Sequence, residues 1–216
     1  MVRLIIFDYD GVIVDSFPNT YETYKVIAKK LNKKFPKNID EFRKIYGYSY
    51  TECYKNLGIV PSEHELAERI YKEESAKLKP ILCEGIEEVL KTLKKSYPLV
   101  LLTANYRQNV ITKLKSFNLS KYFDSVIGKV KTETLPLSKT EEFIKIMKDY
   151  YATQDETIII GDREIDYHHA QEAGIKNIII VEYGWGYNKE KLKGWNQKVI
   201  VHKPHDLLEA ISKIEN

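Results

Sequence analysis

The chain has 216 residues, 43% of them hydrophobic, so it can bury a core as one domain or as one domain with an insertion. Its 34 basic and 31 acidic residues nearly balance, and a net charge of +3 gives little support for a dedicated nucleic-acid surface. No apolar run approaches the length of a membrane span, and the short apolar N-terminal run is interrupted by Asp8 and Asp10. We therefore expect a cytoplasmic protein with no membrane or nucleic-acid partner.

The first expected element is a buried strand over residues 4–7, because Leu-Ile-Ile-Phe is an apolar run of β-forming side chains. The run stops at Asp8, Asp10 and Gly11. Parallel sheets bind their ligands at such strand ends, and a glycine there lets the backbone approach a ligand. Two crowded carboxylates repel each other unless a cation or a proton intervenes.

Residues 16–79 are predicted to form an all-helical insert, because apolar side chains recur there at helical spacing. Ser62 followed by Glu65 has the spacing of a capping box, which predicts the start of a fourth helix. The three earlier stripes consist of Tyr24, Ile27, Ala28 and Leu31, then Phe42, Ile45 and Tyr46, then Cys53, Tyr54 and Leu57.

From residue 80 onward, apolar runs alternate with helical patterns. Strands are expected over residues 99–102, 125–127, 157–160, 177–181 and 199–201, with helices between most of them. This alternation predicts an α/β fold with a doubly wound parallel sheet. We expect residues 1–15 and 80–216 to form one core, into which residues 16–79 are inserted.

Polar side chains follow three of the predicted strands. In a doubly wound sheet such strand ends gather around one crevice, so we expect these side chains to lie close together. The three groups are Asp8 with Asp10, Thr103 with Asn105, and Asp162 with Asp166.

These motifs resemble those of the haloacid dehalogenase-like superfamily, in its phosphatase branch. The first motif, D-x-D-G-V-x-x-D-S, spans residues 8–16; the others are Thr103, a lysine before the fourth strand, and G-D-x-x-x-D at residues 161–166. The helical insertion after the first motif is similar to that of the subclass containing phosphoglycolate phosphatases and β-phosphoglucomutases. The resemblance implies a Rossmann-like core with a helical cap.

By the same resemblance the chain is expected to be a Mg²⁺-dependent phosphatase. Its nucleophile would be Asp8, which forms an aspartyl phosphate, and its general acid and base would be Asp10. The expected metal ligands are Asp8, the backbone carbonyl of Asp10, Asp162 and, directly or through water, Asp166. The expected phosphate and substrate contacts are Thr103, the amides of Ala104 and Asn105, a lysine, and Gly47 with Tyr48 on the cap loop.

Two lysines could neutralise the phosphate, Lys131 and Lys139. Lys139 stands 23 residues before Asp162, close to the separation that the resemblance implies. Ser138 and Glu141 have the spacing of a capping box, which places Lys139 in the first turn of a helix. We therefore predict that Lys139 contacts the phosphate.

The substrate is expected to be a small phosphorylated metabolite of the phosphoglycolate type, bound by a monomer or a homodimer. Halide cleavage is disfavoured, because dehalogenases of this superfamily lack an acid at the position of Asp10. One alternative is a sugar-phosphate mutase, although Tyr50 stands where those mutases carry an arginine. Another is a catalytically idle binding protein on the same fold.

Overall fold

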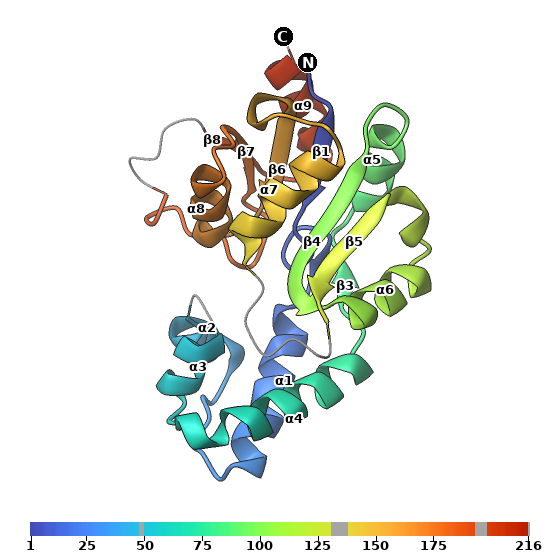
Figure 1. Ribbon diagram of the computed structural model, residues 1–216. Coiled ribbons are helices and arrows are strands. Elements are labelled where there is room, and N and C mark those ends of the chain that lie inside the picture. Colours follow the sequence, from blue (N-terminus) through green and yellow to red (C-terminus); the bar gives the residue numbers. More distant parts are fainter. Residues whose placement is uncertain (48–49, 131–137, 193–197, 216) are drawn as a thin grey trace. The chain divides into compact units, whose positions relative to one another are not determined.

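The computed structural model describes residues 1–47, 50–130, 138–192 and 198–215 (Figure 1). The chain divides into two compact units. One consists of Met1–Asp15 with Ile81–Asn216, and the other of Ser16–Pro80.

The larger unit contains a sheet in which six described strands run parallel. Their order is β5-β4-β1-β6-β7-β8, so the strand that ends at Asp8 lies in the middle. The strands are β1 (Leu4–Phe7), β4 (Leu99–Tyr106), β5 (Ser125–Lys129), β6 (Thr157–Gly161), β7 (Asn177–Val181) and β8 (Lys198–Val201). The predicted α/β fold with a doubly wound parallel sheet is confirmed.

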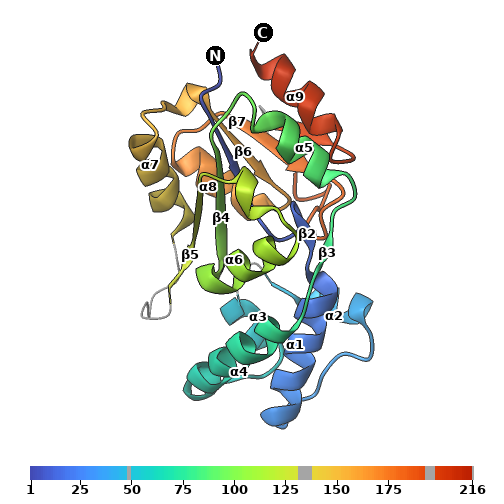
Figure 2. The same ribbon diagram turned by 90° about the vertical axis from the view of Figure 1, so that its right-hand side faces the viewer.

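Side chains of β1 alternate between two apolar clusters, one on each face of the sheet. Ile5 and Phe7 belong to the cluster that includes side chains of α5 (Ile86–Leu93), α6 (Arg107–Ser116) and α9 (Asp206–Glu215). Leu4 and Ile6 belong to the cluster that includes side chains of α7 (Lys139–Asp149) and α8 (Glu164–Glu172). Figure 2 shows α7 and α9 on opposite sides of the sheet. Burial on both faces explains why β1 is a continuous apolar run.

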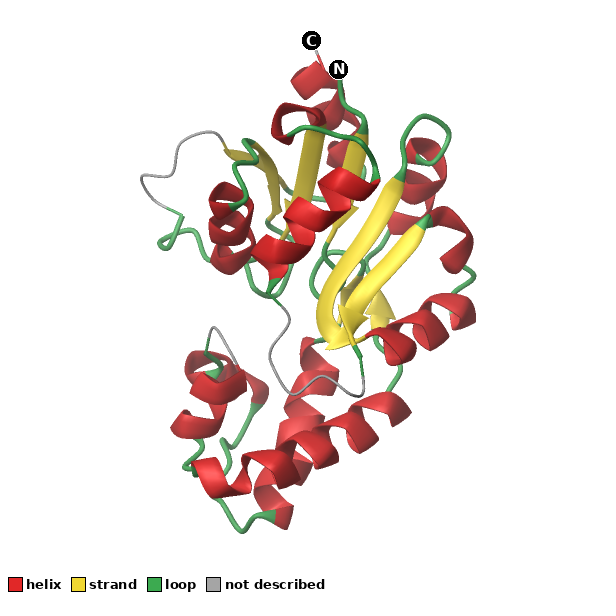
Figure 3. Ribbon diagram, in the orientation of Figure 1, coloured by secondary structure: helices red, strands yellow, loops and turns green. Residues whose placement is uncertain are grey.

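In the described part of Ser16–Pro80, all regular elements are helices (Figure 3). They are α1 (Phe17–Lys30), α2 (Ile39–Ile45), α3 (Tyr50–Asn56), the 3-10 turn η1 (Pro61–Glu63) and α4 (His64–Lys77). Aromatic rings fill the interior of this unit: the Tyr24 ring centroid lies 5.5 Å from that of Phe42 and 5.9 Å from that of Tyr54. Such ring pairs add to the stability that burial provides.

The start of α4 differs from the prediction. The N-cap residue of α4 is Glu63, which makes no side-chain capping hydrogen bond to this helix, so the predicted capping box of Ser62 and Glu65 does not open it. The Glu63 carboxylate instead accepts the backbone N–H of Val60 at 2.9 Å. A 3-10 turn precedes the helix, which shifts its first residue to His64. The helix itself is present where the apolar stripe placed it.

The chain leaves and re-enters the larger unit through a short antiparallel ribbon. It is formed by β2 (Val14–Asp15) and β3 (Ile81–Leu82), with Val14 opposite Leu82 and Asp15 opposite Ile81. Among the described helices none combines the length and the apolar character that a membrane crossing requires.

Candidate active site

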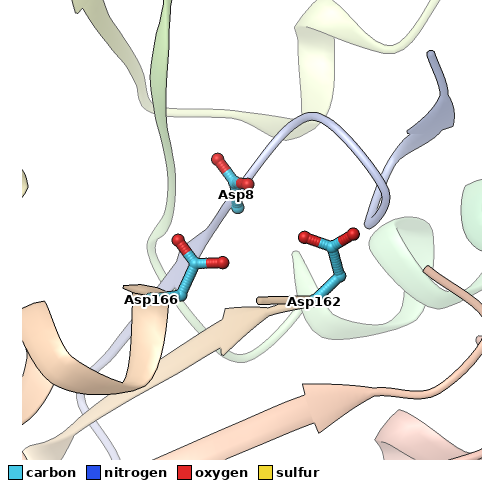
Figure 4. A group of neighbouring side chains, drawn as sticks. All are labelled: Asp8, Asp162 and Asp166. Carbon is cyan, nitrogen blue, oxygen red and sulfur yellow. The ribbon is translucent and has the colours of Figure 1, made fainter. Parts of the chain in front are cut away.

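Three carboxyl groups come together at the carboxyl ends of the central strands. Asp8 follows β1, Asp162 follows the neighbouring strand β6, and Asp166 lies in the first turn of α8 (Figure 4). Each offers an oxygen atom, and these oxygens lie within 4.8 Å of one another. The backbone holds Asp8 in place, since its N–H donates to the carbonyl oxygen of Ile160 at 2.9 Å. The grouping follows from parallel pairing of β1 with β6.

Lys139 supplies a positive charge to this group. Its Nζ lies 3.0 Å from Oδ1 of Asp8 and 2.6 Å from Oδ1 of Asp166, and its side chain is 11% exposed. Lys139 is the first residue of α7, which Ser138 caps by accepting the backbone N–H of Glu141 at 3.4 Å. The cap fixes the first turn of the helix, and the first turn directs the lysine toward both carboxylates.

Three glycines surround the carboxyl group of Asp162. The N–H of Gly186 donates to Oδ2 at 2.8 Å. A Cβ atom at Gly11 would lie 1.9 Å from Oδ2, and one at Gly184 would lie 2.2 Å from Cβ of Asp162. Gly11 also has φ +81°, a backbone conformation that side chains rarely adopt. These positions therefore require glycine so that the backbone can approach the acid.

The pKa values of the three buried carboxyl groups are shifted in different directions. Burial raises the pKa of Asp8 to about 7, against the lowering effect of Lys139. It also holds the pKa of Asp162 well above its usual range. Burial opposes ionisation of Asp166 as well, but the Lys139 ammonium together with the charge and backbone N–H of Arg163 outweighs it, so the pKa of that carboxyl is lowered. The positive charge of Lys139 thus brings the pKa of one carboxyl group below its usual value, whereas the pKa values of the other two stay raised.

This group fits a hard divalent cation. The three residues offer carboxylate oxygens, the ligands that Mg²⁺ prefers. Oδ1 of Asp162 is buried and has no hydrogen-bond partner, although a buried oxygen of this kind is normally satisfied. A bound cation would supply the missing partner and the missing positive charge.

The end of β4 contacts Asp10, which lies two residues after Asp8. Nδ2 of Asn105 donates to Oδ2 of Asp10 at 2.6 Å, and the backbone N–H of Asn105 donates to Oγ1 of Thr103 at 3.1 Å. Thr103 is fully buried, whereas the side chain of Ala104 is exposed. The structure therefore places the predicted residues Asp10, Thr103, Ala104 and Asn105 together, and it shows the amide of Asn105 donating within the protein.

Residues 5–180 match a family described as haloacid dehalogenase-like hydrolase. The chain belongs to this family. It is 25% identical to a phosphorylated carbohydrates phosphatase of Thermotoga maritima, covering 99% of this chain and 100% of that one. It is also 25% identical to the pyrophosphatase PpaX of Halalkalibacterium halodurans, covering 97% of each.

The fold of this hydrolase matches that of its relatives. A predicted phosphatase from Clostridium acetobutylicum has a crystal structure that superposes with a TM-score of 0.86 and 25% identity, covering 99% of both chains. The family predicted from the four motifs is confirmed, and so is the assignment of the chain as a phosphatase.

Other predicted residues of the phosphatase lie elsewhere. Gly47 belongs to the helical unit, where a Cβ atom would lie 2.4 Å from the side chain of Glu52. Tyr48 and Lys131 fall outside the described residues. Sequence reasoning missed the backbone donor Gly186 and the hydrogen bond from the side chain of Asn105 to Asp10, although it placed both Asn105 and Asp10 at the site. The Gly-Trp-Gly run at residues 184–186 was the available signal for the first, because paired small residues after a strand suggest a close backbone approach.

Proposed function

We propose that this phosphatase hydrolyses a phosphomonoester of a small metabolite through an aspartyl phosphate on Asp8. The observation that carries the proposal is the placement of Asp8, which lies at the end of the central strand with Lys139 on one side of its carboxylate and two further acids beside it. A carboxylate in this position can attack phosphorus because neighbouring positive charge offsets its repulsion from the phosphate.

In the proposed complex, Mg²⁺ would be held by Asp8, the backbone carbonyl of Asp10, Asp162 and Asp166. It supplies positive charge that lets a phosphate dianion come close to a carboxylate. Thr103 and the amides near the end of β4 would bind phosphoryl oxygens. Lys139 would neutralise the remaining charge.

The two proton transfers are assigned to Asp10. In the first step an oxygen of Asp8 bonds to phosphorus, the ester P–O bond breaks, and Asp10 gives its proton to the departing oxygen. In the second step water attacks the phosphorus of the aspartyl phosphate, Asp10 takes a proton from that water, and Asp8 is released with inorganic phosphate. Asp10 returns to its protonated form, so the cycle closes.

We further propose that residues 1–15 and 80–216 form the catalytic core and that residues 16–79 act as a cap. Gly47 and Tyr48, which lie between α2 and α3 in the sequence, would then contact the substrate, which we propose to be of the phosphoglycolate type. A cytoplasmic monomer or homodimer suits such a substrate. A mutase is less well supported, because Tyr50 stands where the sugar-phosphate mutases carry an arginine, and its ring instead lies 5.6 Å from that of Tyr54.

The test compares wild type and Asp8→Asn in a phosphate-release assay on a panel of phosphorylated metabolites, with Mg²⁺ and with EDTA. We expect metal-dependent release by wild type and none by the variant, because an amide neither attacks phosphorus nor supplies negative charge to the metal. Acid-quenched wild type should carry the phosphoryl group on Asp8 by mass spectrometry. Metal-dependent hydrolysis that survives in Asp8→Asn would remove Asp8 as the nucleophile.

A further inference from the structure

The contact between Asn105 and Asp10 joins the ends of two neighbouring strands. Asn105 lies near the end of β4 and Asp10 in the turn after β1, and β1 pairs with β4 in the sheet. Their side chains meet at 2.6 Å between Nδ2 and Oδ2, a short distance for a bond from an amide to a carboxylate. Ninety-five residues separate the two in sequence, so only the folded sheet brings them together.

The backbone around Asn105 is held on two sides. Its N–H donates to Oγ1 of the buried Thr103 at 3.1 Å. Its carbonyl oxygen lies against β5, where a Cβ atom at Gly128 would approach it to 2.8 Å. Because the backbone is fixed on both sides, the side chain of Asn105 is presented to Asp10 from a rigid support.

The chemistry of an amide NH₂ limits what Asp10 can do. The NH₂ group only donates, so Oδ2 of Asp10 must be the acceptor, whether or not the carboxyl group is ionised. We propose that Asn105 is a positioning residue that holds the Asp10 carboxyl group in the orientation from which it gives its proton to the departing oxygen.

This inference rests on the proposed function and deepens it, since it assigns a role to a side chain in the first chemical step. It also separates the side chain of Asn105 from the phosphate contacts. A residue that binds the phosphoryl group affects every ester alike, because all share that group. A residue that orients the general acid affects only esters whose departing oxygen needs a proton.

Two model esters separate these roles. β-Glycerol phosphate releases an aliphatic alkoxide, which requires protonation as it leaves. p-Nitrophenyl phosphate releases a stabilised phenolate, which leaves without it. The ratio kcat/KM reports steps up to the first irreversible one, so it isolates attack on phosphorus from later hydrolysis of the aspartyl phosphate.

The experiment uses the full chain with Asn105→Leu, which keeps the branched shape and removes the donor. We expect kcat/KM for β-glycerol phosphate to fall by about 10²-fold and that for p-nitrophenyl phosphate by less than about 3-fold. Retained activity on the aryl ester shows that the variant is folded. Asn109→Leu, in the first turn of α6, is the matched control and should leave both ratios unchanged.

A second measurement places the effect on Asp10. In an Asp10→Asn background, adding Asn105→Leu should change kcat/KM for β-glycerol phosphate by less than about twofold, because the group it positions is already absent. Equal losses on both esters, no loss on either, or a full loss that persists in the Asp10→Asn background would overturn the inference. The proposed function is judged separately, since it stands as long as wild type is active and Asp8→Asn is inactive on both esters.

Discussion

Replacing Lys139 by methionine would test whether one buried cation holds the acidic group together. Methionine keeps most of the length and volume of the side chain and removes its charge together with its hydrogen-bond donors. In the native protein the ammonium lies 3.0 Å from Asp8 and 2.6 Å from Asp166, and its side chain is 11% exposed. Burial alone would lower the pKa of Lys139, but Asp166 and Asp8 hold that pKa above its usual value, so the lysine is charged at neutral pH.

The size of the effect follows from these distances. At an effective dielectric constant of 20, each contact contributes about 6 kcal/mol of attraction before the cost of desolvation. Removing one partner of a buried ion pair typically costs about 3–5 kcal/mol. We therefore expect the metal-free variant to lose about 3–5 kcal/mol of its free energy of unfolding at pH 7.5.

The loss should depend on pH. Without Lys139 the pKa values of Asp8 and Asp166 rise, and a carboxyl with a raised folded-state pKa costs stability once the pH exceeds its unfolded value. The variant should therefore recover much of its stability at pH 5. Urea unfolding at both pH values measures this, with exposed Lys145→Met on the same helix as the control. Equal losses of unfolding free energy at the two pH values would refute the electrostatic argument.

The Lys139→Met variant should also lose activity. Its kcat/KM should fall by about 10²-fold or more, whereas Lys131→Ala should change kcat/KM much less.

Two further predictions concern stability. The metal-free protein should melt at lower temperature as the pH rises from 5 to 7.5, because burial raises the pKa of Asp8 to about 7 and the native state holds a proton there that the unfolded chain has released. Mg²⁺ should restore the melting temperature, and more so at pH 7.5 than at pH 5. A melting temperature of the metal-free protein that does not change with pH in calorimetry would contradict this prediction. Separately, Tyr151→Gly should raise the free energy of unfolding by about 0.5–1 kcal/mol, because Tyr151 is 85% exposed and has φ +51°. An unchanged urea midpoint would show that the left-handed conformation costs nothing there.

The sequence predicted the central strand well and its neighbour only in part. β1 is buried on both faces, so its position appears directly as an apolar run. The expected strand at residues 99–102 instead continues to Tyr106, which pairs with Lys129 of β5 after a register shift. The added residues are joined through backbone groups, and backbone pairing leaves no apolar pattern in the sequence.

The acidic group was predicted from strand ends and motif spacing, but its contacts were not. That Lys139 lies between Asp8 and Asp166 depends on how α7 packs beside α8, and no local pattern encodes that packing. The approach of Gly186 to Asp162 likewise depends on β7 lying next to β6. Local sequence places residues at the ends of elements, whereas tertiary packing decides which atoms meet.

The β2–β3 ribbon has a consequence for how such a chain can change. Asp15 and Ile81 are direct partners across the ribbon, so the segment between them begins and ends at adjacent points. A loop whose ends already meet can grow or shrink at little entropic cost to the unit that carries it. Helical segments of different length and composition can therefore replace one another between β2 and β3. The parallel sheet and the carboxyl groups of Asp8, Asp162 and Asp166 would stay the same.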